Sequence, residues 1–300
     1  MKYDYPGLGI GLLCRLFGKT RHAYYDAMWR RQDTLLMEDI IVTQVATLRK
    51  DLPRLGTRKL HYLLAPLLAS HGIHIGRDQL FDLLSEHGLL IRRRKRKVFT
   101  TDSRHWMRKY SNLICDIQVT RPEQVWVSDI TYVSMASKWG YLSLITDAYS
   151  RKIMGYCFRE DLSAQGCIEA LQMALKNRIY QDPLIHHSDR GSQYCSGQYV
   201  EMLLNNRIAI SMTQNGDPYE NALAERLNGI IKTEFNLNNT QAGFEKTTAQ
   251  IKKSIQTYNQ IRPHASCNYL TPEQAHLKKD PLEKRWKNYK KHPIKDPLSV

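Results

Sequence analysis

Two short apolar runs that each end in an aspartate constrain the fold of this chain more than any other feature. Asp129 follows the run at 125–128, and Asp189 follows the run at 183–188. Such runs are typical of buried strands in an α/β domain. Glu225 lies in a segment with helical periodicity. The three carboxylates could therefore converge on one point, where oxygen ligands of this kind suit Mg²⁺ or Mn²⁺ and paired metals of that type support phosphoryl transfer.

The segment around these acids predicts a mixed α/β domain, because β-branched and aromatic runs alternate with amphipathic helices. The predicted elements, in chain order, are strands at 124–133, 140–149 and 151–159, a helix at 163–178, a strand at 184–187, a helix at 197–206, a strand at 208–212, and the helix that carries Glu225. That last helix is predicted to start near Asp217, as its N-cap, with Pro218 in its first turn. A further helix is predicted at 240–260, and the tail from Lys278 to Lys295 is basic.

The chain is strongly basic, with a net charge of +15 over 300 residues. An excess of this size implies a polyanionic partner, because cations that neutralise phosphates release counterions. The six cysteines form no C-x-x-C pair, which argues against a disulfide framework and a structural zinc site. No apolar stretch is long enough to span a membrane, and the N-terminus does not begin a signal peptide. These features predict a soluble cytoplasmic protein that binds nucleic acid.

Four motifs occur in order along the chain, and together they carry a resemblance. They are the stretches 124–132 (QVWVSDITY) and 186–194 (HHSDRGSQY), the helix with Glu225 and Lys232, and the pair 258–264 (YNQIRPH) and 270–274 (LTPEQ). With them the chain resembles the DDE transposases of bacterial insertion sequences, specifically the OrfB proteins of insertion-sequence family three, which are relatives of retroviral integrases. The resemblance implies a ribonuclease H-like fold with a mixed five-stranded sheet. In that fold the first and fourth strands lie side by side, which would bring Asp129 and Asp189 together.

The resemblance also implies the roles of individual residues. Asp129, Asp189 and Glu225 would be the catalytic residues and the ligands of two Mg²⁺ or Mn²⁺ ions. Lys232, on the same helix face as Glu225, would reach a DNA phosphate. His187, Arg190 and Asn221 are candidates for auxiliary roles near the metals, with a structural role at the strand end as the alternative for His187. Asp147 ends a similar apolar run, so the local pattern alone leaves Asp129 and Asp147 as alternatives, and the family motif selects Asp129.

The N-terminal third is predicted to be all-helical, with a helix-turn-helix-like pattern at 10–31 around Gly18 and a helix at 38–50. A further helix is expected from Thr57, as its N-cap, and another from Arg77 to Glu86. In the family this region is a DNA-binding helix-turn-helix module, and the helix from Arg77 would present Arg77 and Gln79 to DNA. An ordinary helical bundle remains the alternative.

A run of six cations marks the junction between the two parts of the chain, because such a run repels itself and cannot pack in a core. It is expected to follow the DNA backbone, and it consists of Arg92, Arg93, Arg94, Lys95, Arg96 and Lys97. The expected divisions are a short helical segment at 1–35, a helix-turn-helix domain at 36–91, a basic linker at 92–119, the catalytic core at 120–236, and a helical and basic tail at 237–300.

The resemblance implies a DNA transposase that cuts the ends of an insertion element and joins them to a target. The alternatives are a catalytically inactive DNA-binding regulator and a ribonuclease H-like nuclease that cuts without joining. The expected partners are double-stranded DNA, further copies of the chain in a synaptic complex, and an upstream protein, OrfA, supplied in the family by a frameshift fusion. A bacterial, nucleoid-associated location follows from these partners.

Overall fold

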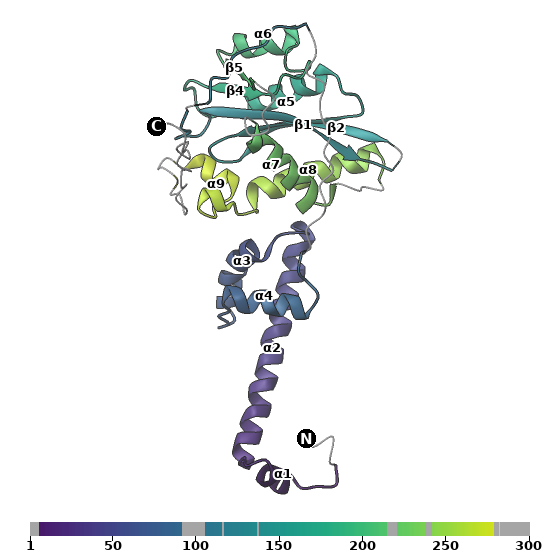
Figure 1. The fold of residues 1–300 in the computed structure, drawn as a ribbon, viewed down its shortest axis with the longest axis vertical. Helices are drawn as coiled ribbons and strands as arrows, with labels where there is room; N and C mark the ends of the chain where they lie inside the picture. The colour runs from purple at the N-terminus through teal and green to yellow at the C-terminus, as the bar shows by residue number, and fades with distance from the viewer. Residues whose placement is uncertain are drawn as a thin grey trace, which may run out of the picture. The chain divides into compact units, whose positions relative to one another are not determined.

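The computed structural model describes residues 6–91, 106–115, 117–136, 138–214, 221–237, 242–278 and 282. The chain divides into two compact units (Figure 1). One contains Met1–Lys50 and Leu55–Arg92, and the other contains Asp51–Arg54 and Arg93–Val300. None of the described helices is both long enough and apolar enough to cross a membrane.

The larger unit is built on a five-stranded mixed sheet, as predicted. Its strands are β1 (Val125–Ser134), β2 (Trp139–Asp147), β3 (Ile153–Arg159), β4 (Ile185–Ser188) and β5 (Ala209–Met212). They lie in the order β3-β2-β1-β4-β5. β2 is antiparallel to β1 and β3, whereas β4 is parallel to both β1 and β5. The expected adjacency of the first and fourth strands is confirmed.

The register between β1 and β4 determines which residues share a level of the sheet. Trp126 lies opposite His186, and Val127 lies opposite His187. Two residues further along each strand the same register reaches Asp129 and Asp189, the second of which comes directly after β4 ends. Residues that are 60 apart in the sequence are thereby neighbours at the C-terminal end of β4.

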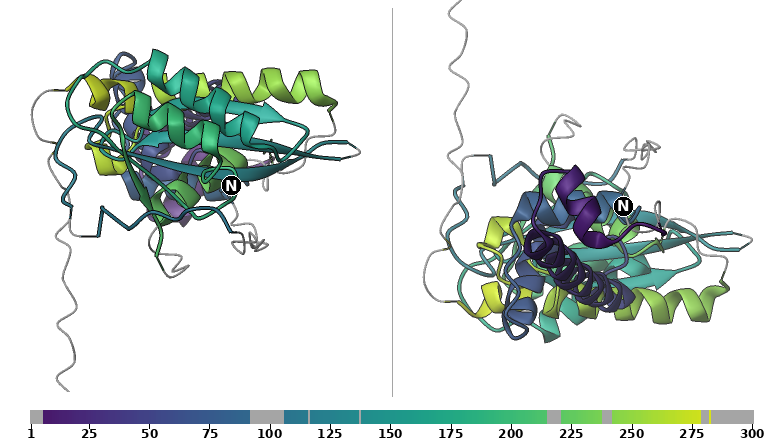
Figure 2. Two further views of the ribbon diagram at one scale, coloured as in Figure 1. Left: turned by 90° about the horizontal axis from the view of Figure 1, so that it is seen from above. Right: turned by 90° about the horizontal axis from the view of Figure 1, so that it is seen from below.

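Helices cover both faces of the sheet. Successive side chains of β1 point to opposite faces, and apolar residues lie on both. Trp126 packs in the core formed with α5 (Ala164–Lys176) and α6 (Gly197–Asn205). Val125 and Val127 point the other way and pack with Ala224 of α7 (Ala222–Glu234). The two views of Figure 2 show α5 and α6 on the side of the sheet away from α7. Asp129, two residues after Val127, faces α7.

The motif at 258–264 fastens α8 (Phe244–Gln260) to its neighbours. The side chain of Asn259 accepts a hydrogen bond from the amide of Ile153 and donates one to its carbonyl, each at 3.0 Å. Arg262, only 1% exposed, donates to both carboxylate oxygens of Glu234, the last residue of α7, at 2.6 and 2.8 Å. The motif therefore anchors the helix that carries Glu225. A short helix, α9 (Pro272–Leu277), follows, and the basic tail from Lys278 lies almost wholly outside the described residues.

The N-terminal unit contains α1 (Ile10–Leu16), α2 (Arg21–Asp51), α3 (Thr57–Ala69) and α4 (Arg77–Glu86). The prediction of separate helices on either side of residues 32–37 was wrong, since α2 runs unbroken through them. Those residues include neither glycine nor proline, so nothing in the backbone ends the helix there. The expected division at residue 35 falls inside α2.

A second correction concerns the start of α3. Thr57 was expected to be its N-cap, but that position is held by Gly56, with extended backbone, and Thr57 is the first helical residue. Pro66 lies within α3, which continues past it to Ala69. The two helices of the expected helix-turn-helix, α3 and α4, are both present in this unit.

Removing the guanidinium of Arg262 should destabilise the larger unit, because it leaves Glu234 charged and largely buried without its partner. We expect Arg262→Ala to lower the free energy of unfolding by roughly 3–5 kcal/mol, measured by urea titration followed by circular dichroism. The control is Lys253→Ala, which removes an exposed ion pair to Asp51 and should cost below about 1 kcal/mol. Equal effects of the two substitutions would contradict the anchoring role of Arg262.

Candidate active site

Asp129 lies on β1 with both carboxylate oxygens engaged. Its Oδ1 accepts a hydrogen bond from the backbone amide of Ile130 at 2.9 Å, and its Oδ2 accepts one from the side-chain amide of Asn228 at 2.7 Å. Asn228 is a buried residue of α7. The second hydrogen bond therefore joins the strand that carries Asp129 to the helix that carries Glu225.

Asp189 lies in the turn that follows β4. Its Oδ1 accepts a hydrogen bond from the amide of Gly191 at 3.0 Å, which closes the turn around the carboxylate. A Cβ added at Gly191 would lie 3.0 Å from that same oxygen and 3.1 Å from Oε1 of Gln193. Glycine at this position therefore leaves room for the carboxylate beside the backbone of the turn.

Glu225 lies in the first turn of α7, where its side chain is exposed. Asn221, the N-cap residue, donates from its side chain to the carbonyl of Ser128 at 3.0 Å and so holds the start of α7 against β1. Asn221, Glu225, Asn228 and Lys232 recur at helical spacing and share one face. The expected cap residues Asp217 and Pro218 lie outside the described residues, and α7 begins at Ala222.

The charges of Asp189 and Glu225 act on Asp129. The pKa of Asp129 is raised to about 7, mainly by burial and also by those two charges, whereas the hydrogen bonds from Asn228 and Ile130 lower it. Burial lowers the pKa of Lys232, and the charge of Asp129 raises it. Lys232 is thus close enough to Asp129 for the two charges to interact. The site concentrates negative charge that a cation would compensate.

The carboxylate and amide oxygens suit a hard divalent cation, although the three acids do not converge to within metal-binding distance of one another. Among the described residues, no three His, Cys, Asp or Glu side chains are grouped closely enough to hold a metal ion. The exposed Glu225 would have to turn toward the two aspartates. The side-chain oxygens of Asn221 and Asn228 are buried and have no hydrogen-bond partner. Oxygen ligands and uncompensated acceptors of this kind fit Mg²⁺ or Mn²⁺.

The auxiliary residues differ in position. His187 is fully buried, and its Nδ1 lies 2.8 Å from the hydroxyl of Ser211 on β5, so it supports the sheet beneath the site. Arg190 follows Asp189 and is half-buried. The neighbouring His186 received no role from the sequence. Its Nε2 lies within 3.0 Å of the hydroxyls of Ser128 and Tyr199, and burial lowers its pKa to about 3, so it is neutral.

Asp147, which resembles Asp129 in local sequence, occupies a different environment. It is fully buried at the end of β2 and accepts hydrogen bonds from the backbone amides of Glu123 and Ser150 and from the hydroxyl of Ser150, all at 2.7 Å. His276 of α9 joins the same network through Ser150 and Glu123. Asp147 therefore has its acceptors filled by the protein, whereas Asp129 faces two other acids.

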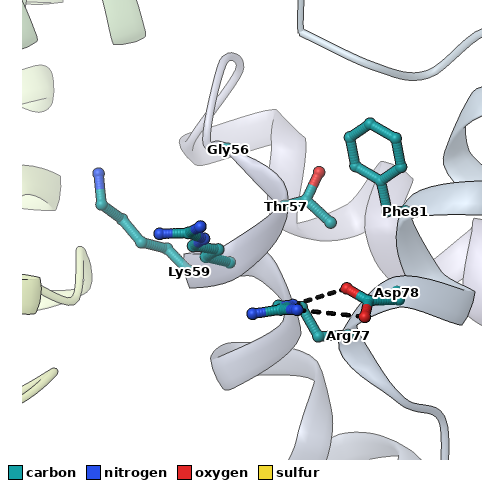
Figure 3. Close-up of a pocket in the computed structure, with 7 residues that line it drawn as sticks. Gly56, Thr57, Lys59, Arg77, Asp78 and Phe81 are labelled. Atoms are coloured by element: carbon teal, nitrogen blue, oxygen red, sulfur yellow. Dashed lines mark hydrogen bonds and ion pairs between the residues drawn. The ribbon is translucent and has the colours of Figure 1, made fainter.

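A small pocket of about 420 Å³ lies between α3 and α4 of the N-terminal unit (Figure 3). Its lining residues are Gly56, Thr57, Arg58, Lys59, Arg77, Asp78 and Phe81. Arg77 is paired with Asp78 at 2.8 Å, and Gln79 accepts a hydrogen bond from the amide of Gly76 at 3.0 Å, so both predicted DNA-contacting residues also stabilise the start of α4. The basic run from Arg92 to Lys97 lies outside the described residues.

The raised pKa of Asp129 makes the metal-free fold sensitive to pH. The folded state holds a proton up to about pH 7 that the unfolded chain releases near pH 4, so this contribution to stability is lost as the pH rises through 7. We expect Asp129→Asn, in the presence of EDTA, to increase the free energy of unfolding at pH 8 by roughly 1–3 kcal/mol. The gain should shrink toward pH 4.

The control for that measurement is Asp182→Asn, which changes an exposed carboxylate and should alter the free energy of unfolding little at either pH. A loss of stability in Asp129→Asn at pH 8, or a gain that does not depend on pH, would show that Asp129 is not held among like charges.

Comparison with known proteins identifies the larger unit. The integrase core domain family matches residues 119–218, and a second integrase core domain family matches residues 206–272. The HTLV-2 integrase catalytic core domain, solved in complex with magnesium, is 22% identical, with a TM-score of 0.42, over 52% of this chain and 97% of that one.

Relatives from insertion sequences extend the match into the N-terminal unit. The insertion element IS600 uncharacterized 31 kDa protein of Shigella sonnei is 32% identical over 272 residues, which are 87% of this chain and 96% of that protein. Transposase InsF for insertion sequence IS3A of Escherichia coli is 35% identical over 160 residues, which are 53% of this chain and 56% of InsF. The chain therefore belongs to the IS3-type transposases, the insertion-sequence enzymes of DNA transposition that have an integrase catalytic core.

Proposed function

We propose that this polynucleotidyl transferase cuts the ends of its insertion element and joins the resulting 3′-hydroxyls to target DNA, with Asp129, Asp189 and Glu225 as catalytic carboxylates and ligands of two Mg²⁺ or Mn²⁺ ions. The observation that carries the proposal is the placement of Asp129 on β1 beside the turn that follows the parallel strand β4 and contains Asp189, with α7, the helix of Glu225, joined to Asp129 through Asn228. The raised pKa of Asp129, caused by burial and by the charges of the other two acids, agrees with this placement.

The surrounding residues position the acids. Asn228 donates to one carboxylate oxygen of Asp129, and the amide of Gly191 donates to one carboxylate oxygen of Asp189 in its turn. Asn221 ties the first turn of α7 to β1 and so sets where Glu225 can reach. Lys232, seven residues after Glu225 on the same face, compensates the charge of a DNA phosphate beside the site. Bound metal ions would activate the attacking oxygen and stabilise the leaving oxygen.

The net charge of +15 favours binding to DNA, because lysines and arginines neutralise its phosphates. The N-terminal unit contributes cations at the pocket between α3 and α4, where the exposed Arg58 and the half-buried Lys59 line the same pocket as Arg77. The proposal places double-stranded DNA along this pocket and along the basic run at 92–97. Because the family's OrfA supplies end recognition, we expect this chain alone to bind element ends with little sequence specificity. A bacterial location with the nucleoid follows.

A strand-transfer assay with end-labelled DNA and Mg²⁺ separates joining from cutting alone and from binding alone. We expect wild-type protein to join ends, and Asp129→Asn, Asp189→Asn and Glu225→Gln each to reduce joining by roughly 10²-fold or more, because each removes charge that the transition state requires. Asp182→Asn should retain activity. Cutting without joining would indicate a nuclease, and DNA binding without either reaction would indicate a regulator.

The α3–α4 pocket can be tested separately by the salt dependence of DNA binding. Replacing Arg58 and Lys59 by alanine should weaken binding to any DNA sequence, and the slope of log K against log salt should fall by about 1 for each phosphate that is no longer neutralised. The matched control is Lys176→Ala, an exposed cation in the last turn of α5. An unchanged slope in the double variant would move the DNA path away from this pocket.

A further inference from the structure

The N-terminal part of α2 extends beyond the rest of its unit. Figure 1 shows α3 and α4 beside the C-terminal part of α2, while the remainder projects away from them and ends next to α1. The buried residues of the 31-residue helix are Ile41 and Val45, which both lie in its second half. More than three turns of helix at its beginning therefore have little protein packed against them.

That projecting half exposes a continuous apolar stripe, here called the α2 stripe and made of Met28, Trp29, Leu35 and Leu36. Their exposed fractions are 45%, 57%, 56% and 60%. Residues seven apart fall on the same side of a helix, so Met28 and Leu35 align, as do Trp29 and Leu36. Ile41 lies about 140° around the helix from Met28, so the stripe faces away from the side that packs within the unit.

Helices in proteins gain most of their stability from packing, since intrinsic propensity leaves short isolated helices only marginally stable in water. The projecting half of α2 lacks such packing within its own unit. Large apolar side chains gathered on one surface mark a site of association. α1 adds to the same region, with Leu16 and Phe17 exposed by 68% and 57%. A partner that buries the α2 stripe must therefore have a surface that is also apolar and elongated.

Charge and symmetry identify that partner as a second copy. Residues 21–31 contain three arginines and one aspartate, whereas residues 32–39 contain three acids and no cation. Two antiparallel copies would set the basic half of each beside the acidic half of the other, and two parallel copies would set like charges together. The apolar residues also lie symmetrically about Gln32, since Met28 and Leu36 are four positions from it and Trp29 and Leu35 are three.

We propose that two copies of this chain pack antiparallel along the α2 stripe, centred near Gln32, through one isologous contact. Met28 of one copy then meets Leu36 of the other, and Trp29 meets Leu35. DNA does not suit this surface, because the acidic residues at 33–39 repel phosphates. Pairing of this kind needs neither metal nor catalysis, so its failure would leave the strand-transfer prediction untouched.

The first experiment measures the mass of the full chain in solution without DNA. We expect twice the 35.0 kDa chain mass at micromolar concentration by light scattering, and the single-chain mass for Trp29→Glu/Leu36→Glu. The control Leu204→Glu changes a side chain on α6 that is equally exposed, at 57%, and should remain dimeric. Since all three side chains are exposed, circular dichroism should show unchanged helix content. A monomeric wild-type chain, or an unaffected double variant, overturns the proposal.

The second experiment determines orientation by cysteine cross-linking in a Cys115→Ser background, which removes the exposed native thiol. Met28→Cys and Leu36→Cys proteins are oxidised separately and as a mixture. The antiparallel pair predicts disulfide-linked dimers in the mixture and little cross-linking in either protein alone. Efficient linking of Met28→Cys to itself indicates a parallel pair and contradicts the proposed arrangement, as does the absence of a disulfide-linked dimer in the mixture.

Discussion

The hydrogen bond from Asn228 to Asp129 joins the two elements whose relative position decides whether the three acids can act together. β1 places Asp129 beside Asp189 through the parallel pairing with β4, but Glu225 reaches that point only if α7 lies against the same face of the sheet. Asn221 makes a second connection to the backbone of β1. Both amides therefore stabilise a cluster of like charges that, without compensation, would push the helix and the strand apart.

The C-terminal motif gives that arrangement its rigidity from the far side. Arg262 holds the last residue of α7, and Asn259, on α8, holds β3, so the far end of α7 is connected through α8 to the sheet. The backbone amide of Arg54 also donates to the carbonyl of Glu234, which satisfies an acceptor at the end of the helix. Residues more than 30 positions beyond the acids in the sequence thus hold one of them in place.

Local patterns were sufficient for most elements of the larger unit. The five strands and the helices α5, α6 and α8 lie within a few residues of their predicted bounds, because alternation and helical periodicity are strong there. The pairing of Asp129 with Asp189 came from the family resemblance, since no local feature distinguishes Asp129 from Asp147. Asn228 and Arg262 received no role, because their hydrogen bonds join segments 99 and 28 residues apart. The continuity of α2 was missed because a polar stretch at 32–34 interrupts the apolar periodicity of that helix.

The unbroken course of α2 has a geometric consequence, since an α-helix rises about 1.5 Å per residue and resists bending. From Gln32 to Val45, where α3 and α4 pack, the helix covers roughly 20 Å. Two copies paired through Gln32 would therefore keep their α3–α4 modules roughly 40 Å apart, comparable to the 34–36 Å of one turn of duplex DNA. The length of α2 would then set the distance between the two α3–α4 modules. Lengthening the helix by whole turns would change the spacing between the two DNA segments that one dimer can hold.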